Sequence, residues 1–215
     1  MSEQQGPNIG ASLLHIHRAI SRGIAVSREK SQAFAEAGYP DEATAAGFWT
    51  YVQTLESVTH GHHLTEDDLF FPYLRDRLPG ADFDGLMGDH QTIAAILDEI
   101  GAAREAGSLQ DLHQALTKLE AAWHPHRGKE EATFSPQVAA EIMTPPEHIE
   151  LGQQAAAHSQ EHGVPAPLIV PFVLFNLEPG DRAAMSAAYP PEIPNHLVPV
   201  VWKDQWAPMK PFFLD

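Results

Sequence analysis

The sequence predicts an all-α protein, an up-down-up-down four-helix bundle followed by a proline-rich, partly helical C-terminal extension. Amphipathic patterns extend over four long stretches, residues 9–37, 42–78, 83–106 and 108–139. The short segments between them contain the Gly, Pro and Asp residues expected at helix ends. Six of the 18 prolines precede residue 140 and twelve follow it, so only the first part can carry long helices. Long helices with short connections favour antiparallel neighbours in a bundle.

The proline distribution also suggests a boundary near Thr144, which two prolines follow. We expect a bundle over residues 1–144 and an extension over residues 145–215 that packs on it. Large aromatic side chains left in water would form an exposed apolar patch, so we expect those of the extension to complete the core. They are Trp202, Trp206, Phe212 and Phe213. Two other roles fit the same residues, a lid over a site in the bundle or a surface for a second copy of the chain.

Composition narrows the classes of function. With 215 residues, 43% of them hydrophobic, the chain can bury one substantial core. The 13 basic and 29 acidic residues give a net charge of −16, which argues against nucleic acid and anionic membranes as partners. The N-terminus MSEQQGPN lacks the pattern of a signal peptide, and the longest apolar run is too short to span a bilayer, so we expect a cytoplasmic protein. The absence of Cys excludes disulfides, thiolate nucleophiles, iron–sulfur clusters and Cys-type zinc sites.

Two segments of the predicted bundle repeat one pattern of eleven residues, His-x-x-x-Glu-(Asp/Glu)-x-x-x-x-Pro. The first copy runs from His62 to Pro72 and the second from His126 to Pro136. On a helix, a His and a Glu four residues apart lie one above the other, so each copy offers an imidazole and a carboxylate to one metal ion. Two copies suggest a site for two metal ions.

Placing successive residues about 100° apart around each predicted helix shows which polar side chains fall on its apolar face. Each helix contributes one His to that face, and the second and fourth helices contribute a Glu as well. The inward residues are His17, His62, Glu66, His90, His126 and Glu130. The same projection turns His60, His113, His124 and Glu131 outward and places His63 at the edge.

A structural reading competes with the metal site. A single buried His is most often a core residue satisfied by a hydrogen bond. A buried Glu is different, because an unpaired carboxylate in a bundle core is unfavourable enough to need a cation or a proton. A pair of divalent metal ions accounts for both Glu residues and for the His residues stacked with them. His and carboxylate ligands accept iron, manganese and zinc alike, so the residue types leave the metal open.

The remaining histidines are not assigned to this site. Six of them share no spacing with an inward carboxylate: His113, His124, His148, His158, His162 and His196. We expect His158 and His162 to form a solvated or locally hydrogen-bonded pair on a helix. His60 and His63 could donate hydrogen bonds to a metal ligand or form weak external sites.

Two rival metalloprotein classes fail on spacing. Ferritin-like oxidases need Glu-x-x-His on two helices, and no His here has an acidic residue three positions before it. Zinc hydrolases with the His-Glu-x-x-His motif need a second His four residues after the first, with a Glu between them, and neither copy of the repeat provides it.

The repeat, the Phe71-Pro72 ending of its first copy, the early His17 and the intervening His90 resemble the hemerythrin-like (HHE cation-binding) domain, over about residues 10–140. The resemblance implies a non-haem centre of two iron ions with an oxo or hydroxo bridge that handles dioxygen, peroxide or nitric oxide. It implies His17, His62, His90 and His126 as terminal iron ligands, and Glu66 and Glu130 as bridges. The extension is similar to that of the actinobacterial type of this family.

One position departs from the family pattern. Members commonly supply a fifth His one turn along the third helix from the residue that matches His90, but the positions four away are Leu86 and Ala94. Water, a small molecule or another side chain could fill the vacant place on one iron. Tyr39 is our candidate, because the related iron–sulfur repair proteins carry an extra ligand at about this distance between their first two metal histidines. Tyr51 lies too far along its helix from His62 for this role.

Three functions are compatible with such a centre. The first is a di-iron oxidoreductase with catalase-like peroxide or nitric oxide chemistry, which an open metal position favours. The second is a non-catalytic sensor or carrier of oxygen or iron. The third is a di-iron substrate oxygenase in which the extension acts as a lid over an apolar pocket. We expect a monomer or a homodimer, and we assign no catalytic residue.

Overall fold

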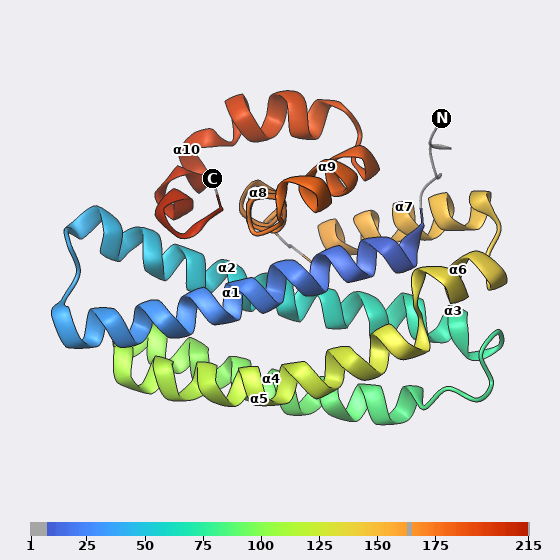
Figure 1. The fold of residues 1–215 in the computed structure, drawn as a ribbon, viewed down its shortest axis with the longest axis horizontal. Helices are drawn as coiled ribbons and strands as arrows, with labels where there is room; N and C mark the ends of the chain where they lie inside the picture. Colours follow the sequence, from blue (N-terminus) through green and yellow to red (C-terminus); the bar gives the residue numbers. More distant parts are fainter. Residues whose placement is uncertain (1–7, 163–164, 215) are drawn as a thin grey trace.

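The computed structural model describes residues 8–162 and 165–214, and within these residues every element is helical and none is a strand. This agrees with the predicted all-α class. Four long helices lie side by side (Figure 1), namely α1 (Ile9–Ala37), α2 (Glu42–Thr65), α4 (Phe83–Ala106) and α5 (Leu109–Thr133). α1 contacts α2 and α5, and α4 contacts the same two helices, so the four surround a common interior. No helix among the described residues is both long enough and apolar enough to cross a membrane.

Polar caps explain where the long helices begin. Asn8, Asp41, Asp82 and Ser108 each accept a hydrogen bond through the side chain from the backbone amide three residues further on. The first amides of a helix have no partner within it, and a capping oxygen supplies one. The observed starts lie within one residue of those predicted from the sequence.

The second long stretch is not the single α-helix that we expected over residues 42–78. α2 ends at Thr65, and Glu66–Phe70 forms a π-helical turn, η1, in which the Phe71 amide donates to the Glu66 carbonyl. The chain then resumes as the short helix α3 (Phe71–Arg75). Pro72 has no N–H to donate, which removes one α-helical hydrogen bond in this region and favours a local change of helix type.

The π turn changes which side chains face inward beyond it. Such a turn holds one more residue than an α turn, so a projection at constant α-helical phase fails after it. At constant α-helical phase, Leu69 and Tyr73 would face the interior, but the structure leaves both only partly buried. Phe71 and Leu74 are buried in their place.

The fourth long stretch, expected over residues 108–139, is also divided. α5 ends at Thr133 and α6 (Pro136–Ile142) begins three residues later. Ser135 caps α6 by accepting a hydrogen bond from the Val138 amide at 3.2 Å. Pro is favoured at the first position of a helix and disrupts helix interiors, so Pro136 accounts for this break.

A layer of polar side chains separates two apolar clusters inside the bundle. On α1, Ile9 and Leu13 belong to one cluster and Ile20 and Ile24 to the other, and His17 lies between them. The inward His residues of the other three long helices also lie between residues of the two clusters. The predicted site residues therefore share one level of the bundle.

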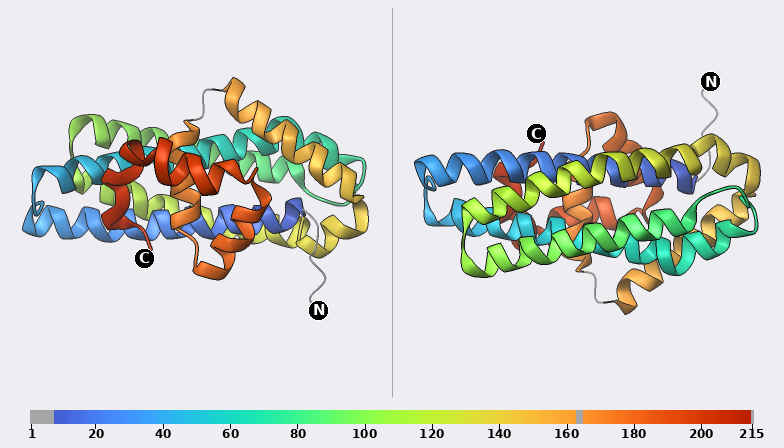
Figure 2. Two further views of the ribbon diagram at one scale, coloured as in Figure 1. Left: turned by 90° about the horizontal axis from the view of Figure 1, so that it is seen from above. Right: turned by 90° about the horizontal axis from the view of Figure 1, so that it is seen from below.

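The C-terminal elements lie on the α1–α2 side, on the face opposite α4 and α5 (Figures 1 and 2). Phe172 and Phe212 are buried in the larger apolar cluster, and Trp202, Trp206 and Phe213 pack against it partly buried. The elements after α6 are α7 (Pro145–Glu161), α8 (Ala166–Phe175), α9 (Pro179–Ala188), η2 (Ile193–Val201), α10 (Lys203–Trp206) and η3 (Ala207–Phe212).

Two glycines allow these C-terminal elements to approach closely. A Cβ at Gly23 would lie 2.7 Å from the Cζ atom of Phe172 in α8. A Cβ at Gly47 would overlap the backbone carbonyl of Pro208 in η3. Both positions therefore need a residue without a side chain.

A buried polar network centred on Asn176 fixes the end of α8. The Tyr51 hydroxyl donates to Asn176 Oδ1 at 2.7 Å, and the Arg22 guanidinium donates to the same oxygen at 2.5 Å. Arg22 also donates to the Phe212 carbonyl at 2.8 Å. These bonds join α1 and α2 to the end of α8 and to η3.

Candidate metal centre

The structure brings six of the seven predicted site residues together in the polar layer. They come from all four long helices and from η1, and their exposed fractions range from 0% for His17 to 8% for His62. The six are His17, His62, Glu66, His90, His126 and Glu130.

One group of donor atoms lies between α1, α2 and the two glutamates. His17 Nε2 is 3.1 Å from His62 Nε2 and 3.1 Å from Glu130 Oε2. His62 Nε2 is 3.4 Å from Glu66 Oε2. Ligand atoms bound about 2.1 Å from one ion lie about 3 Å apart, so these four residues can share one metal ion.

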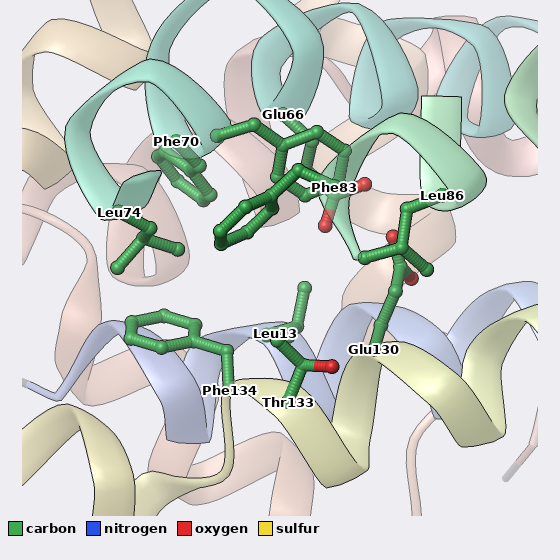
Figure 3. A pocket seen from close by; sticks show the side chains of 10 residues that line it. Leu13, Glu66, Phe70, Leu74, Phe83, Leu86, Glu130, Thr133 and Phe134 are labelled. Atoms are coloured by element: carbon green, nitrogen blue, oxygen red, sulfur yellow. The ribbon is translucent and has the colours of Figure 1, made fainter. Parts of the chain in front are cut away.

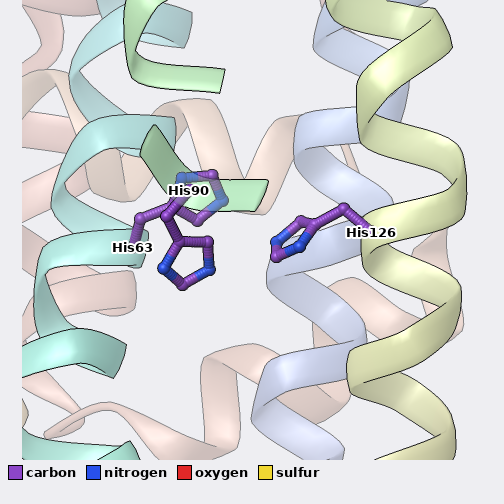
Figure 4. A group of neighbouring side chains, drawn as sticks. All are labelled: His63, His90 and His126. Atoms are coloured by element: carbon purple, nitrogen blue, oxygen red, sulfur yellow. The ribbon is translucent and has the colours of Figure 1, made fainter. Parts of the chain in front are cut away.

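A second group consists of three histidines, and one of them, His63, was not assigned to the site from the sequence. Figure 4 shows His126 of α5 directed toward His63 and His90. The His63 and His90 rings stack with centroids 4.0 Å apart, and the His63 and His126 centroids are 5.1 Å apart. One donor nitrogen from each of the three lies within 4.8 Å of the others. His63 is buried, and the sequence-based projection had placed it only at the edge of the apolar face.

Both glutamates contact donor atoms of the two groups. Glu130 Oε1 lies 3.2 Å from His90 Nε2, and Glu130 Oε2 lies 3.2 Å from His126 Nε2. The same Oε2 atom is close to His17 in the first group. Glu66 Oε2, which faces His62, is 3.6 Å from His90 Nε2. Each carboxylate is therefore placed between the groups.

Two further carboxylates orient the histidine rings. Asp67 Oδ1 lies 2.8 Å from His90 Nδ1, and Glu131 Oε1 lies 3.1 Å from His17 Nδ1. An ionised carboxylate only accepts, so each Nδ1 carries the proton and, in the neutral ring, the Nε2 lone pair faces the interior. Asp67 and Glu131 are the acidic residues that follow the inward Glu in the two copies of the repeat. The repeat itself was the signal for their role, although projection alone turned Glu131 outward.

Five buried polar atoms of the cluster have no hydrogen-bond partner among the described residues. They are Glu66 Oε2, Glu130 Oε2, His63 Nε2 and both ring nitrogens of His126. Buried polar atoms are rarely left without a partner. Cations placed among the donors would satisfy the two carboxylate oxygens and the inward ring nitrogens, so the residues fit a metal centre.

The charges of the isolated protein point the same way. Burial lowers the pKa of His62 and of His63 well below the usual value, so both rings are neutral and can offer a lone pair. Burial, with the nearby Glu130 charge, raises the pKa of Glu66 well above the usual value. For Glu130 burial acts in the same direction, but hydrogen bonds from three histidines outweigh it and hold the pKa well below the usual value. Without a cation, two adjacent carboxylates do not both ionise easily.

Tyr39, the seventh predicted site residue, is not part of the cluster. Its ring packs against Phe34, with centroids 4.9 Å apart, in the connection between α1 and α2. His62 lies about 30 Å further along α2 than its first residue, Glu42, at 1.5 Å per residue. Tyr39 therefore lies too far along the bundle to join the cluster in this structure, whereas His63 lies within it.

A model of the hemerythrin HHE cation-binding domain matches residues 8–138 of the chain. The chain belongs to this family. The match spans the four long helices and both groups of donors, and it ends before α7. Comparison with curated proteins and with solved structures found no match. The family is one of cation-binding domains, which agrees with the buried His and Glu cluster.

In this hemerythrin-family chain, a small apolar cavity ends at the two glutamates. Figure 3 shows the Glu66 and Glu130 carboxylates on one side of it and the rings of Phe70, Phe83 and Phe134 on the other. The cavity volume is about 10 Å³, which is room for one water-sized molecule. The residues that line it come from the bundle, namely Leu13, Glu66, Phe70, Phe71, Leu74, Phe83, Leu86, Glu130, Thr133 and Phe134.

Proposed function

We propose that this protein holds two iron ions in the polar layer of its bundle and uses them to bind a molecule of the size of dioxygen, nitric oxide or peroxide. The observation that carries the proposal is the pair of donor groups joined by Glu66 and Glu130, each of which contacts histidines of both groups. A single metal ion would leave one of these groups without a cation. We also propose that the four long helices follow an up-down-up-down order and that the protein is of the actinobacterial type of its family.

The two groups would hold the ions unequally. His63, His90 and His126 would hold one iron, His17 and His62 the other, and the two glutamates would bridge them. When bound, a pair of irons in this ligand set supplies the electron transfer and Lewis acidity that reactions of dioxygen, peroxide and nitric oxide require. The side with two histidines has fewer protein ligands, so we expect the small molecule to bind there.

The size of the cavity favours a small inorganic molecule over an organic substrate. A volume of about 10 Å³ next to the carboxylates has room for one molecule of about the size of water, whereas pockets for organic ligands are typically about 300–1,000 Å³. The described residues after Phe134 do not line this cavity. A substrate oxygenase with the C-terminal extension as a lid is therefore not supported.

The lining of the cavity favours reversible binding over rapid turnover. Apart from the two glutamates, its lining is Phe and Leu side chains with one hydroxyl, that of Thr133. That hydroxyl already donates its proton to the Lys129 carbonyl at 2.8 Å. Cleavage of an O–O bond gains from a positioned proton donor, and this lining offers none besides the proposed metal ligands. A carrier or sensor is thus our first choice, and a di-iron oxidoreductase is the second, because the less ligated side could accept peroxide.

Metal analysis of the purified protein tests the centre directly. We expect about two irons per chain in the wild type and almost none in the double variant Glu66→Ala, Glu130→Ala. A matched double variant at exposed positions of α1 and α4, Glu36→Ala and Glu105→Ala, should keep the wild-type content. Zinc and manganese measured in the same samples settle the identity of the metal. A folded wild type that binds no iron, even when supplied with ferrous iron without oxygen, would overturn the proposal.

Optical spectroscopy then separates the two functions. If the protein is a carrier or sensor, the reduced, iron-loaded protein changes its absorption when oxygen or nitric oxide is added and recovers when the gas is removed. If it is an oxidoreductase, it releases oxygen from peroxide at a rate that the Glu66→Ala, Glu130→Ala variant lacks. Turnover in that variant would assign the activity to contaminating metal.

A further inference from the structure

We propose that Asp68, His158 and His162 form a second metal site, on the surface where η1 meets the last turn of α7, for a single divalent transition-metal ion such as zinc or ferrous iron. The three side chains lie outside the cluster in the bundle core and take no part in the function proposed above. Two of them, Asp68 and His162, are exposed, so an ion can reach them from solvent.

The spacing of the three residues suits one ion. His158 Nε2 lies 2.9 Å from Asp68 Oδ2, and the His158 and His162 rings have centroids 4.1 Å apart. One donor atom from each residue lies within 4.8 Å of the other two. Two histidines four residues apart on one helix face, with a carboxylate from a second element, form a set that zinc and ferrous iron both accept.

Hydrogen bonds fix which nitrogen of His158 carries the proton. The Thr65 hydroxyl donates to the Gly61 carbonyl at 2.8 Å, so its one proton is used and its oxygen can only accept. That oxygen lies 3.5 Å from His158 Nδ1, which must therefore be the donor. In the neutral ring the lone pair is then on Nε2, and it points at the Asp68 carboxylate, which is also an acceptor. Two acceptors 2.9 Å apart need a cation or an added proton between them.

His162 is prepared in the same way. Its Nδ1 lies 2.9 Å from the His158 backbone carbonyl, to which it donates. The neutral His162 ring thus keeps its lone pair on Nε2. Ring nitrogens of metal-binding histidines are commonly fixed by such a bond from the other nitrogen, so both rings have the tautomer that a metal needs.

The π turn explains why this acidic side chain is available at the surface. Three consecutive residues of η1 reach three different places: Glu66 enters the core cluster, Asp67 contacts His90, and Asp68 contacts His158. An ion at the surface site would tie α7 to the turn that carries Glu66. From the sequence we expected His158 and His162 to form a local pair on a helix, and helical spacing cannot reveal a partner carboxylate that lies 90 residues away in sequence.

Calorimetric titration with Zn²⁺ tests the site on iron-loaded protein, with the iron content measured before and after. We expect one added zinc per chain in the wild type without loss of iron. His162→Gln should weaken this binding by at least about tenfold, since even the loss of a partner outside the ligand set costs 10–100-fold in affinity. Asp68→Asn should weaken it as well. His124→Gln, an exposed His on α5, is the matched control and should bind zinc as the wild type does.

Three results would overturn the proposal. They are no zinc binding beyond the core centre, equal binding by His162→Gln and the wild type, and uptake of zinc matched by loss of iron, which would mean exchange in the core. The absence of added zinc would leave a proton as the species between His158 and Asp68. The variant Glu66→Ala, Glu130→Ala should still bind one zinc at the surface site, so failure of this inference is distinguishable from failure of the proposed di-iron centre.

Discussion

At the scale of single residues, the acidic residue after each inward Glu connects one helix of the bundle to a histidine on another. Asp67 orients His90 of α4, and Glu131 orients His17 of α1. Burial by itself would lower the pKa of these two histidines, but the neighbouring carboxylates raise it above the usual value. The repeated motif thus encodes both a donor and the support for a donor on a different helix.

Asp67→Asn should weaken metal binding by about tenfold or more, because the neutral amide no longer fixes the His90 tautomer by its charge. Competition with a chelator of known affinity measures the change. Asp98→Asn, at an exposed position of the same helix as His90, should have no effect. An unchanged affinity in Asp67→Asn would show that packing alone orients the ring.

His63→Gln should lower the metal content from about two ions per chain to about one, because it removes a donor from the three-histidine group only. His60→Gln, exposed three positions earlier on α2, serves as the control and should keep both ions. Elemental analysis of both variants measures the number of metal ions per chain. Full metal content in His63→Gln would mean that His63 only packs against His90.

The predicted burial of the six inward side chains agrees with the structure, because helical phase is reliable over short distances. Each of the six lies within about two turns of buried apolar residues along the chain. His63 was not assigned because the width of a polar patch on a helix is set by what the other helices place opposite it. Tyr39 was proposed by resemblance, and the length of α2 shows why it cannot reach the cluster.

At the scale of elements, the N-terminus of α7 is held by one carboxylate. Glu147 accepts hydrogen bonds from the Thr144 amide at 2.7 Å and from the Tyr73 hydroxyl at 3.0 Å, and it pairs with Arg77. These interactions, led by the Thr144 amide, lower the pKa of Glu147 to about 2. The carboxylate therefore joins the start of α7 to α3.

The stability that Glu147 contributes should depend on pH in a defined window. Because its pKa is lower in the folded chain, the contribution is fully present above the ordinary value of 4.5 and is lost as the pH falls toward 2. Acidification from pH 5 to pH 3, about the range in which ordinary carboxyl groups titrate, should therefore destabilise Glu147→Gln less than the wild type. Thermal unfolding across this range measures the difference. Glu150→Gln, on the same helix, is the control. Parallel curves for wild type and Glu147→Gln would contradict the assignment.

Gly47→Ala should lower the free energy of unfolding by about 1–3 kcal/mol, because the added Cβ meets a backbone carbonyl of η3 that cannot turn aside. Gly88→Ala is the matched variant, since nothing lies within 4 Å of its Cβ position on α4. It should raise stability by up to about 1 kcal/mol through helix propensity. Denaturant unfolding measures both. Equal effects would mean that η3 does not pack on α2 as described.

The elements themselves were predictable to different degrees. Caps and glycines located the helix starts and the ends of α1 and α4, because these signals are local. The π turn and the break before Pro136 were not predicted, because the proline that ends each copy of the repeat has a different effect. Pro72 follows a π turn, whereas Pro136 begins a separate helix. Which outcome is adopted depends on the partners of the freed backbone groups and side chains.

At the scale of the whole molecule, the polar layer makes stability depend on the metal. Removal of metal by a chelator should lower the free energy of unfolding, by about 2.7 kcal/mol for each site that was occupied at 100 times its dissociation constant. The Glu66→Ala, Glu130→Ala variant should show no such dependence. Denaturant unfolding with and without chelator measures the difference. A wild type equally stable in both conditions would indicate that the layer is satisfied without a metal.

The same layer has a consequence for cooperativity. The two apolar clusters have no buried residue in common. The layer that separates them consists of two glutamates and several histidines rather than apolar side chains. Regions with few apolar contacts open first in native-state fluctuations. Without metal, the end of the bundle near α3 and α6 can thus open while the end covered by α8 stays closed. A metal pair that binds donors from both sides of this plane would make the two ends unfold as one unit.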